Sequence, residues 1–370
     1  MKDIIYLDAA ASALKPQSVI DCEMDFLTNH YANAGRGVCA RSQYVDDMVN
    51  RVRGQVASFI NASPEQIVFT SGTTDGMNRI VKILESSNFI RPETRVLVSD
   101  IDHHSARLPW EELAMRGGCT IDAWALDENF NLDIHENKRT NVLVLTAMSN
   151  VMGVPQDIKK ITQSVRSQNP NAIIIVDAAQ YVAHAPIDVT DWDVNFVCFS
   201  GHKIGADTGV GVMYVQYPEF FNPDKFGGGM IDKITDEGWR LSGGPHKFEA
   251  GTLPLTQIAG LGVAIDELIK RQSDHSCVQY LYDELSKIDR IKLLTARDAS
   301  MVTMVVDGMH VLDFGALMGA HNICVRVGNM CATWIHQRLG IDGSIRLSPG
   351  PWNTMDEMKS VIDVIKKIVK

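Results

Sequence analysis

The chain lacks the features that mark membrane proteins, disulfide-rich proteins and proteins with a secretory leader. It contains no run of about 18 apolar residues, so we expect no membrane span. Its first residues, MKDIIYLDAAAS, lack the long apolar core of a signal peptide. The seven cysteines form no C-x-x-C pair. This argues against a zinc site and a disulfide framework, and it favours free thiols in a reducing, cytoplasmic compartment.

Positive charge is also scarce, because the formal net charge is −10 at pH 7 and no basic run occurs. This balance argues against a nucleic-acid partner. The chain has no internal repeat and no low-complexity tract. With 370 residues, of which 45% are hydrophobic, it is long enough for one large and one small globular unit.

Apolar runs that read as strands alternate with helical patterns through the first two thirds of the chain. The expected strands are residues 66–70, 95–98, 119–124, 142–146, 172–176 and 194–199. The expected helices are residues 75–84, 105–115 and 157–167. This alternation predicts an α/β fold with a mostly parallel sheet and helices on both faces.

The pattern changes after residue 252. We expect helices at 257–271, 274–288, 312–319 and 356–369, and strands at 300–306 and 322–327. These elements predict a smaller C-terminal α/β unit, with a soft boundary near residue 255.

Chemically useful residues follow several of the expected strands. TSGTTDG at residues 70–76 lies between a strand and a helix, where backbone N–H groups and hydroxyls can face an anion, although a plain helix cap is the alternative. Asp177 ends the run AIIIVD, where α/β sheets place ligands, unless it only caps the next turn. Lys203 follows the run FVCFSGHK and can form a Schiff base if burial lowers its pKa, the alternative being a surface lysine.

The sequence Asp102-His103-His104 follows another of these strands. A histidine there can stack on a ring or move protons, or it can simply be solvated. No third ligand with suitable spacing accompanies the pair, so we expect no metal. A phosphate loop, a histidine, an aspartate and a lysine, in that order, are together what pyridoxal phosphate requires.

The chain resembles the class V, fold-type I pyridoxal-phosphate enzymes, and among them the cysteine desulfurase/selenocysteine lyase family. The resemblance covers nearly the whole chain. The matching stretches are YLDAAAS, YANAGRG, TSGTTDG, DHH, SNVMG, VDAAQ, SGHKIGADTGVG, FGGGMI, FEAGT and RVGNMCA. The resemblance implies a large domain (1–255) built on a mostly parallel sheet of the seven-stranded type. Its N-terminal segment would pack on the small domain. The small C-terminal domain (256–370) would carry a catalytic cysteine.

The resemblance also assigns roles to individual residues. Lys203 would carry the cofactor and move the substrate α-proton. Asp177 would pair with the pyridinium, His103 would stack on the ring, Gln180 would bind its hydroxyl and Asn150 would lie close by. The phosphate would be held by Thr73, Thr74, Ser200, His202 and, from a neighbouring subunit, Thr252. These assignments imply a homodimer with shared active sites.

Cys331 and Arg346 carry the sulfur chemistry in this resemblance. A free cysteine is most often a small buried hydrophobe, and Arg346 alone could be a loop arginine. In the family pattern R-x-G-x-x-C-A, however, the cysteine takes sulfur from L-cysteine. Arg346 would grip the substrate carboxylate, with Asn150 and Arg36 as further substrate contacts. The short spacing from Cys331 to Arg346 resembles group II (SufS-like and CsdA-like) enzymes. It implies a small sulfur-acceptor protein and a role in iron–sulfur cluster assembly.

Departures from the family pattern cluster on the substrate side. Met330 stands where group II enzymes commonly have histidine, Gly35 replaces the histidine of H-R-G, Cys39 replaces a later histidine, and Trp334 replaces a proline. The alternatives are therefore another class V reaction, namely that of a selenocysteine lyase, C–S lyase, aminotransferase or epimerase. A non-catalytic sulfur-trafficking scaffold is a third hypothesis.

Overall fold

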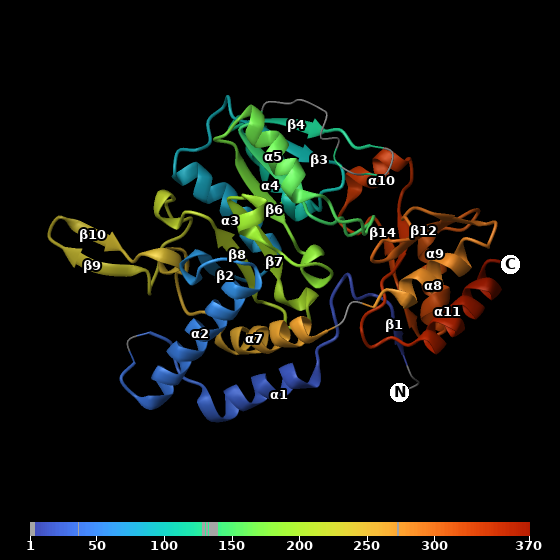
Figure 1. The fold of residues 1–370 in the computed structure, drawn as a ribbon, viewed down its shortest axis with the longest axis horizontal. Coiled ribbons are helices and arrows are strands. Elements are labelled where there is room, and N and C mark those ends of the chain that lie inside the picture. Colours follow the sequence, from blue (N-terminus) through green and yellow to red (C-terminus); the bar gives the residue numbers. More distant parts are fainter. Residues whose placement is uncertain (1–3, 36, 128–129, 131, 133–139, 272–273) are drawn as a thin grey trace.

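The structure, a computed structural model, describes residues 4–370 except 36, 128–129, 131, 133–139 and 272–273. It has two lobes that lie side by side (Figure 1). The large lobe surrounds a seven-stranded sheet in the order β2-β8-β7-β6-β5-β3-β4. Its strands are β2 (Ile67–Thr70), β3 (Arg95–Ser99), β4 (Thr120–Trp124), β5 (Val142–Thr146), β6 (Ile173–Asp177), β7 (Phe196–Ser200) and β8 (Gly211–Val215).

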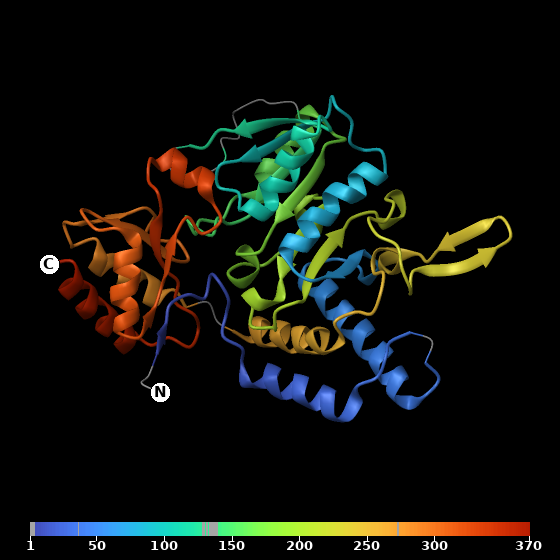
Figure 2. The same ribbon diagram turned by 180° about the vertical axis from the view of Figure 1, so that it is seen from behind.

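This sheet is mostly parallel, and the predicted fold class is confirmed. Strand β8 alone runs antiparallel to its neighbours β2 and β7, while the pairs from β7 to β4 are parallel. Helices α3 (Thr73–Ser86) and α4 (His104–Met115) cover one face (Figures 1 and 2). The other face is covered by α2 (Ala40–Phe59), α5 (Ile158–Gln168) and α7 (Leu255–Lys270).

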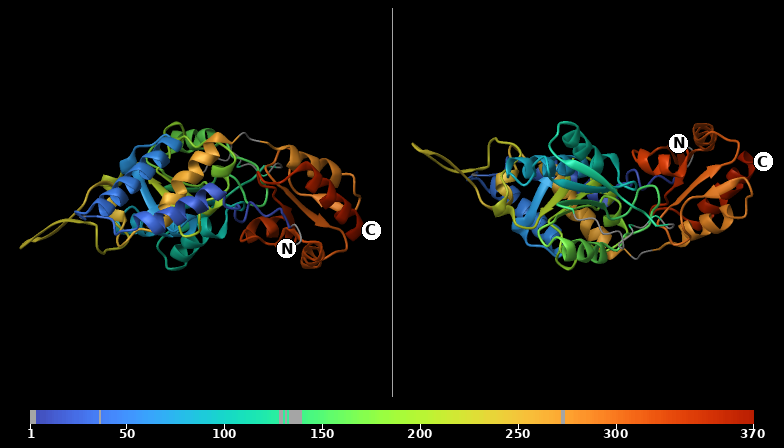
Figure 3. Two further views of the ribbon diagram at one scale, coloured as in Figure 1. Left: turned by 90° about the horizontal axis from the view of Figure 1, so that it is seen from below. Right: turned by 90° about the horizontal axis from the view of Figure 1, so that it is seen from above.

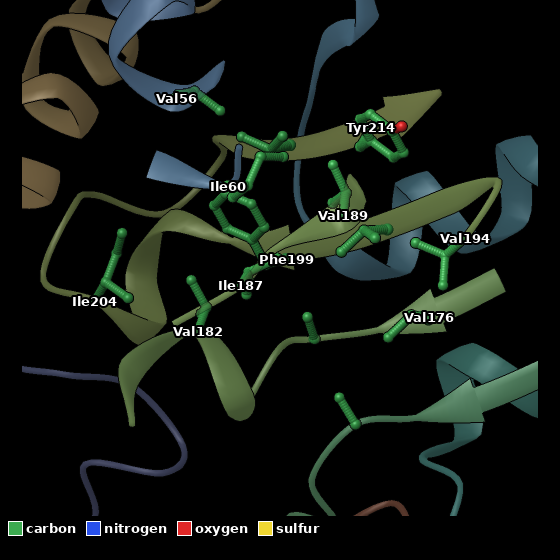
Figure 4. Packing of buried hydrophobic residues seen from close by; sticks show 14 of the residues in the cluster. Val56, Ile60, Val176, Val182, Ile187, Val189, Val194, Phe199, Ile204 and Tyr214 are labelled. Atoms are coloured by element: carbon green, nitrogen blue, oxygen red, sulfur yellow. The ribbon is translucent and has the colours of Figure 1, made fainter. Parts of the chain in front are cut away.

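Successive residues of a central strand enter opposite cores. In β6, Ile173 and Ile175 pack beneath α3 and α4, while Ile174 and Val176 pack on the other side. This double burial explains the unbroken apolar run that precedes Asp177. Figure 4 shows the second core, in which Val176 and Phe199 from the sheet share a cluster with Val56 and Ile60 at the end of α2.

The small lobe is an antiparallel sheet covered by helices. Its strands are β11 (Ile291–Leu293), β12 (Val302–Val306), β14 (Arg326–Gly328) and β15 (Ser344–Leu347), in the order β11-β12-β15-β14. Its helices are α8 (Ser276–Leu285), α9 (Val311–Ala320) and α11 (Met355–Ile368). The single strand predicted over 322–327 is wrong. The strand is interrupted at Val325. The first part, β13 (Ile323–Cys324), pairs with β1 (Ile5–Tyr6), whereas β14 pairs with β15.

Several elements lie outside the predicted set. They are the helices α1 (Gln17–Asp25), α2, α6 (Val189–Trp192) and α10 (Thr333–Leu339), the strands β1, β8, β11 and β15, and the hairpin β9 (Ile231–Thr235) and β10 (Gly238–Leu241). Helix α7 packs on α1 and α2, so its buried side belongs to the large lobe, although a division at residue 255 assigns it to the C-terminal unit. The described helices include none with the length and hydropathy that a bilayer crossing requires.

Candidate active site

The ends of several strands bring the predicted site residues to one edge of the large sheet. Asp177 is the last residue of β6, and Ser200 is the last residue of β7. The loop after β2 leads into α3 at Thr73, and His103 precedes α4. Because parallel strands end at a common edge, segments far apart in sequence meet here.

A cavity of about 320 Å³ lies at this edge, between the two lobes. All predicted site residues except Thr252 and Arg36 line it. They are Thr73, Thr74, His103, Asn150, Asp177, Gln180, Ser200, His202, Lys203, Cys331 and Arg346. Thr252 is exposed and is not among the lining residues, and Arg36 lies outside the described residues.

Lys203 places its side-chain amine in the lining of this cavity. Its Nζ donates a hydrogen bond to the carbonyl of Ala10. Its pKa is lowered to about 8, mainly by burial and then by the nearby charge of Arg346, while Asp177 and Asp8 act in the opposite direction. A substantial fraction of this amine is therefore neutral near pH 8, which is the form that attacks a carbonyl.

Asp177 is a buried acid that faces the same cavity. Its Oδ1 accepts a hydrogen bond from the N–H of Ala179 at 2.9 Å. Burial raises its pKa to about 6, and the nearby carboxylate of Asp102 also raises it. A cationic ring nitrogen in the cavity would stabilise the ionised acid, because it would replace the lost hydration.

The N-terminus of α3 forms one end of the cavity. The hydroxyls of Thr73 and Ser200 lie 2.8 Å apart, and the N–H of Thr73 donates to Ser200 Oγ at 2.8 Å. A Cβ on Gly211 would lie 2.6 Å from Gly72 Cα, so glycine allows the loop to pack on β8. Hydroxyls at a helix N-terminus suit a phosphate group.

His103 presents a neutral ring to the cavity. Its Nδ1 accepts from the N–H of Ser105 at 3.1 Å and lies 2.7 Å from the Ser105 hydroxyl. Burial lowers its pKa to about 4, with Lys203 contributing in the same direction. A neutral imidazole fixed through Nδ1 is suited to stacking on a flat ligand.

Cys331 lies in a turn that the large lobe holds at two points. Asn150 Nδ2 donates to the carbonyl of Met330 at 2.8 Å, and the N–H of His104 donates to the carbonyl of Cys331 at 2.8 Å. Met330 and Cys331 both have left-handed backbone conformations, with φ of 51° and 55°. Two consecutive non-glycine residues in this region are a strained arrangement that holds the thiol at the cavity.

Arg346 is a buried guanidinium on β15. It donates to the carbonyl of Asn150 at 2.8 Å and to Asp8 at 3.1 Å, and its Nε has no hydrogen-bond partner among the described residues. Arg326, which also lines the cavity, pairs with the same Asp8. Buried donors that lack a partner are suited to a carboxylate ligand.

Sequence reasoning gave no role to Asp8, Arg326 or Ser105. Asp8 and Arg326 stand inside the stretches YLDAAAS and RVGNMCA, next to β-forming residues. A charged residue beside such a strand is the signal that could have marked them as site residues. The pairing that brings them together depends on β1 and β14 lying near β15, which no local pattern reveals.

Comparison with known proteins finds a family and relatives that match nearly the whole chain. The profile of the aminotransferase class-V family matches residues 5–361. The cysteine desulfurase of Serratia proteamaculans is 31% identical over 383 residues, which cover 99% of this chain and 94% of the relative. The probable cysteine desulfurase of Vibrio cholerae is 32% identical over 381 residues, with the same coverage of both chains.

Solved structures resemble the fold over almost its whole length. The apo structure of a cysteine desulfurase from Thermococcus onnurineus has a TM-score of 0.94 at 29% identity, covering 99% of this chain and 94% of that one. The Escherichia coli cysteine desulfurase CsdA, in its S-sulfonic acid form, has a TM-score of 0.90 at 28% identity, covering 98% and 94%.

Proposed function

The chain belongs to the aminotransferase class-V family, and from this premise we propose that it is a pyridoxal-phosphate-dependent cysteine desulfurase. It would convert L-cysteine to L-alanine and keep the sulfur as a persulfide on Cys331. One observation carries the proposal: a single cavity is lined by a lysine with a pKa of about 8, a buried acid and an exposed thiol. The names of the full-length relatives support it.

The residues of the cavity fit pyridoxal phosphate. Three buried polar atoms in its lining, His202 Nδ1, Asn150 Oδ1 and Arg346 Nε, have no partner among the described residues, as expected of a site built for a polar ligand. Lys203 would hold the cofactor covalently, and Asp177 would face its ring nitrogen. The remaining contacts of the cofactor would be Thr73, Thr74, Gln180, Ser200 and His202, and His103 would stack on its ring.

When bound, pyridoxal phosphate supplies an electron sink for the charge left as a substrate Cα loses its proton. Arg346 would bind the substrate carboxylate with parallel hydrogen bonds. Lys203 would accept the α-proton at Nζ. The Cys331 thiolate would attack the substrate sulfur, forming the S–S bond. The C–S bond would break with its electron pair on Cβ, which then takes a proton, so cysteine and thiol become alanine and persulfide.

We propose that the enzyme works as a homodimer in the cytoplasm and passes its sulfur to a small acceptor protein for iron–sulfur cluster assembly. The exposed position of Thr252 supports a contact with a neighbouring subunit. The short segment from Cys331 to Arg346 supports an acceptor, because a thiol on a turn whose backbone carbonyls accept two hydrogen bonds from the large lobe has little reach of its own.

The test is the pair Cys331→Ala and Cys39→Ala, because these two cysteines are the exposed ones. Cys331→Ala should keep the yellow absorbance of the bound cofactor and lose at least about 100-fold in alanine formation from L-cysteine. The Cys39→Ala protein is the matched control and should retain both. Mass spectrometry should find the added sulfur on the peptide that contains Cys331.

Full alanine production by the Cys331→Ala protein would contradict the proposed thiol mechanism. Pyruvate or a keto acid as the main product would instead identify a C–S lyase or an aminotransferase. Failure to bind the cofactor with Lys203 intact would point to a non-catalytic scaffold.

A further inference from the structure

We propose that a second cavity, next to the candidate active site, binds a small organic anion that has an apolar body and one acidic group. We call it the hinge cavity. It is lined by residues 9–10 and 13, 58–59, 180 and 182–186, 203, 268–269, 271, 274–275, 277–278, 300 and 348–353. Apart from Gln180 and Lys203, none of these lining residues has a role in the proposed desulfurase reaction.

The hinge cavity has the size and lining of a ligand site. Its volume is about 650 Å³, within the range of about 300–1,000 Å³ found for small-molecule pockets. It lies where the N-terminal segment and the end of α7 pass between the two lobes (Figures 1 and 3). Phe59, Leu268 and Trp352 are among its apolar walls.

Three basic side chains other than Lys203 line this cavity: His184, Arg271 and His275. Within the described part of the chain none of them has a side-chain hydrogen bond or an ion pair. Asp274 is the one acid among the lining residues, and its Oδ1 already accepts from the N–H of Ser276 at 2.8 Å, at the start of α8.

The electrostatics favour an anion over a cation. Burial lowers the pKa of Arg271, and Glu267 acts in the opposite direction without forming an ion pair. Burial also lowers the pKa of His184 to about 4, with further lowering by His275 and Arg271, so this imidazole is neutral at pH 7. The Arg271 side chain is partly exposed and His184 is half-buried, and a guanidinium near a neutral imidazole donor can bind a carboxylate, sulfonate or phosphate group.

The position of the hinge cavity gives its ligand a physical connection to the catalytic lysine. Ala10, Gln180 and Lys203 line both cavities. The carbonyl of Ala10 accepts from Lys203 and, at 2.7 Å, from Gln180, while its N–H donates to Ser348 Oγ at 3.0 Å. A ligand against Ala10 and Ser348 therefore contacts the segment that holds both cofactor-side groups.

The test is calorimetric titration of the cofactor-loaded protein with 1-naphthoate and with 1-naphthyl phosphate, using 1-naphthalenemethanol as the neutral analogue. We expect at least one of the two anions to bind at one site per chain, and whichever binds identifies the acidic group. Arg271→Gln should weaken the anion at least about tenfold, because a charge-assisted hydrogen bond is lost, and leave the neutral analogue unchanged.

Two further variants locate the binding. Arg297→Gln is the matched control, because Arg297 is an exposed arginine that pairs with Asp283 elsewhere on the surface, and it should change nothing. Ala183→Leu should narrow the cavity and weaken both anion and neutral analogue. The proposal is overturned if neither anion binds, if Arg271→Gln leaves the affinity intact, or if Arg346→Gln abolishes binding while Arg271→Gln does not.

Discussion

At the scale of single residues, opposing charges surround the amine of Lys203. Arg346 lowers the pKa of Lys203, while Asp177 and Asp8 raise it, and burial sets the overall direction. Asp8 also pairs with Arg346 and Arg326. The pKa of Lys203 is therefore raised by the same carboxylate that pairs with Arg346 and Arg326.

This arrangement predicts opposite effects for two substitutions. In cofactor-free protein, uptake of pyridoxal phosphate requires the neutral amine of Lys203, so its rate should rise with pH through a midpoint near 8. Asp8→Asn removes a charge that raises the pKa of Lys203, so the midpoint should fall. Arg346→Gln removes a charge that lowers this pKa, so the midpoint should rise.

The measurement is the rate of growth of the cofactor absorbance band at each pH, which is independent of turnover. Lys203→Ala is the control and should show no covalent attachment after borohydride reduction. Midpoints that move in the same direction in the two variants would contradict the proposed balance of charges.

Residues at strand ends could be predicted from the sequence, whereas residues that act through pairing could not. Asp177 and Lys203 each follow an unbroken apolar run, and the length of such a run fixes where the strand must end. Asp8 lies only a few residues from the N-terminus, yet it bonds to Arg346, 338 residues away. No periodicity in the sequence encodes that contact.

At the scale of elements, a buried ion pair connects α2 to the segment after β10 within the large lobe. Arg53 donates to both carboxylate oxygens of Glu249 at 2.8 Å and to the carbonyl of Ile67. The same carboxylate accepts from the N–H of Phe69 at 2.8 Å. One pair therefore connects helix α2, strand β2 and the segment that leads to Thr252.

Breaking this pair should destabilise the protein strongly. Glu249→Gln leaves the Arg53 guanidinium buried without its counter-charge, which typically costs about 3–5 kcal/mol in the free energy of unfolding. The double variant Arg53→Met/Glu249→Leu should lose much less than the sum of the single variants, because neither charge remains buried. Urea unfolding followed by circular dichroism measures both quantities.

Asp283→Asn, which breaks the exposed pair with Arg297, is the control and should leave the unfolding midpoint unchanged. If Glu249→Gln unfolded at the same urea concentration as this control, the buried pair would not fasten the lobe.

Elements differ in how well their sequence predicts them. Strands β5 and β6 are predicted closely, because both faces of each are buried and the apolar runs are continuous. Helix α2 was missed, although Val45, Met48, Val49, Val52 and Val56 recur at helical spacing. The hairpin β9–β10 offers no such signal, because its residues are almost all exposed and no core imposes a period on them.

At the scale of the whole molecule, that hairpin is the feature that a single chain does not explain. It projects from the large lobe at the end away from the small lobe (Figures 1 and 3). Ile234 is 76% exposed and Trp239 is 57% exposed, and Phe226 packs edge-on against Trp239 at 5.6 Å between ring centroids. Exposed apolar side chains on a projecting element are typical of an interface.

The proposed homodimer gives these side chains a role, and the role can be tested. The double variant Ile234→Lys/Trp239→Lys should weaken the dimer at least about 100-fold, because two large apolar side chains lose their burial. Leu312→Lys on α9 of the small lobe is the matched control, since Leu312 is 60% exposed and helix α9 lies at the opposite end of the molecule from the hairpin (Figure 1). Sedimentation velocity over a dilution series should show monomers for the hairpin variant and dimers for the control. A dimer of unchanged affinity in the hairpin variant would mean that subunits meet elsewhere. A control that dissociates as well would place the contact on the small lobe.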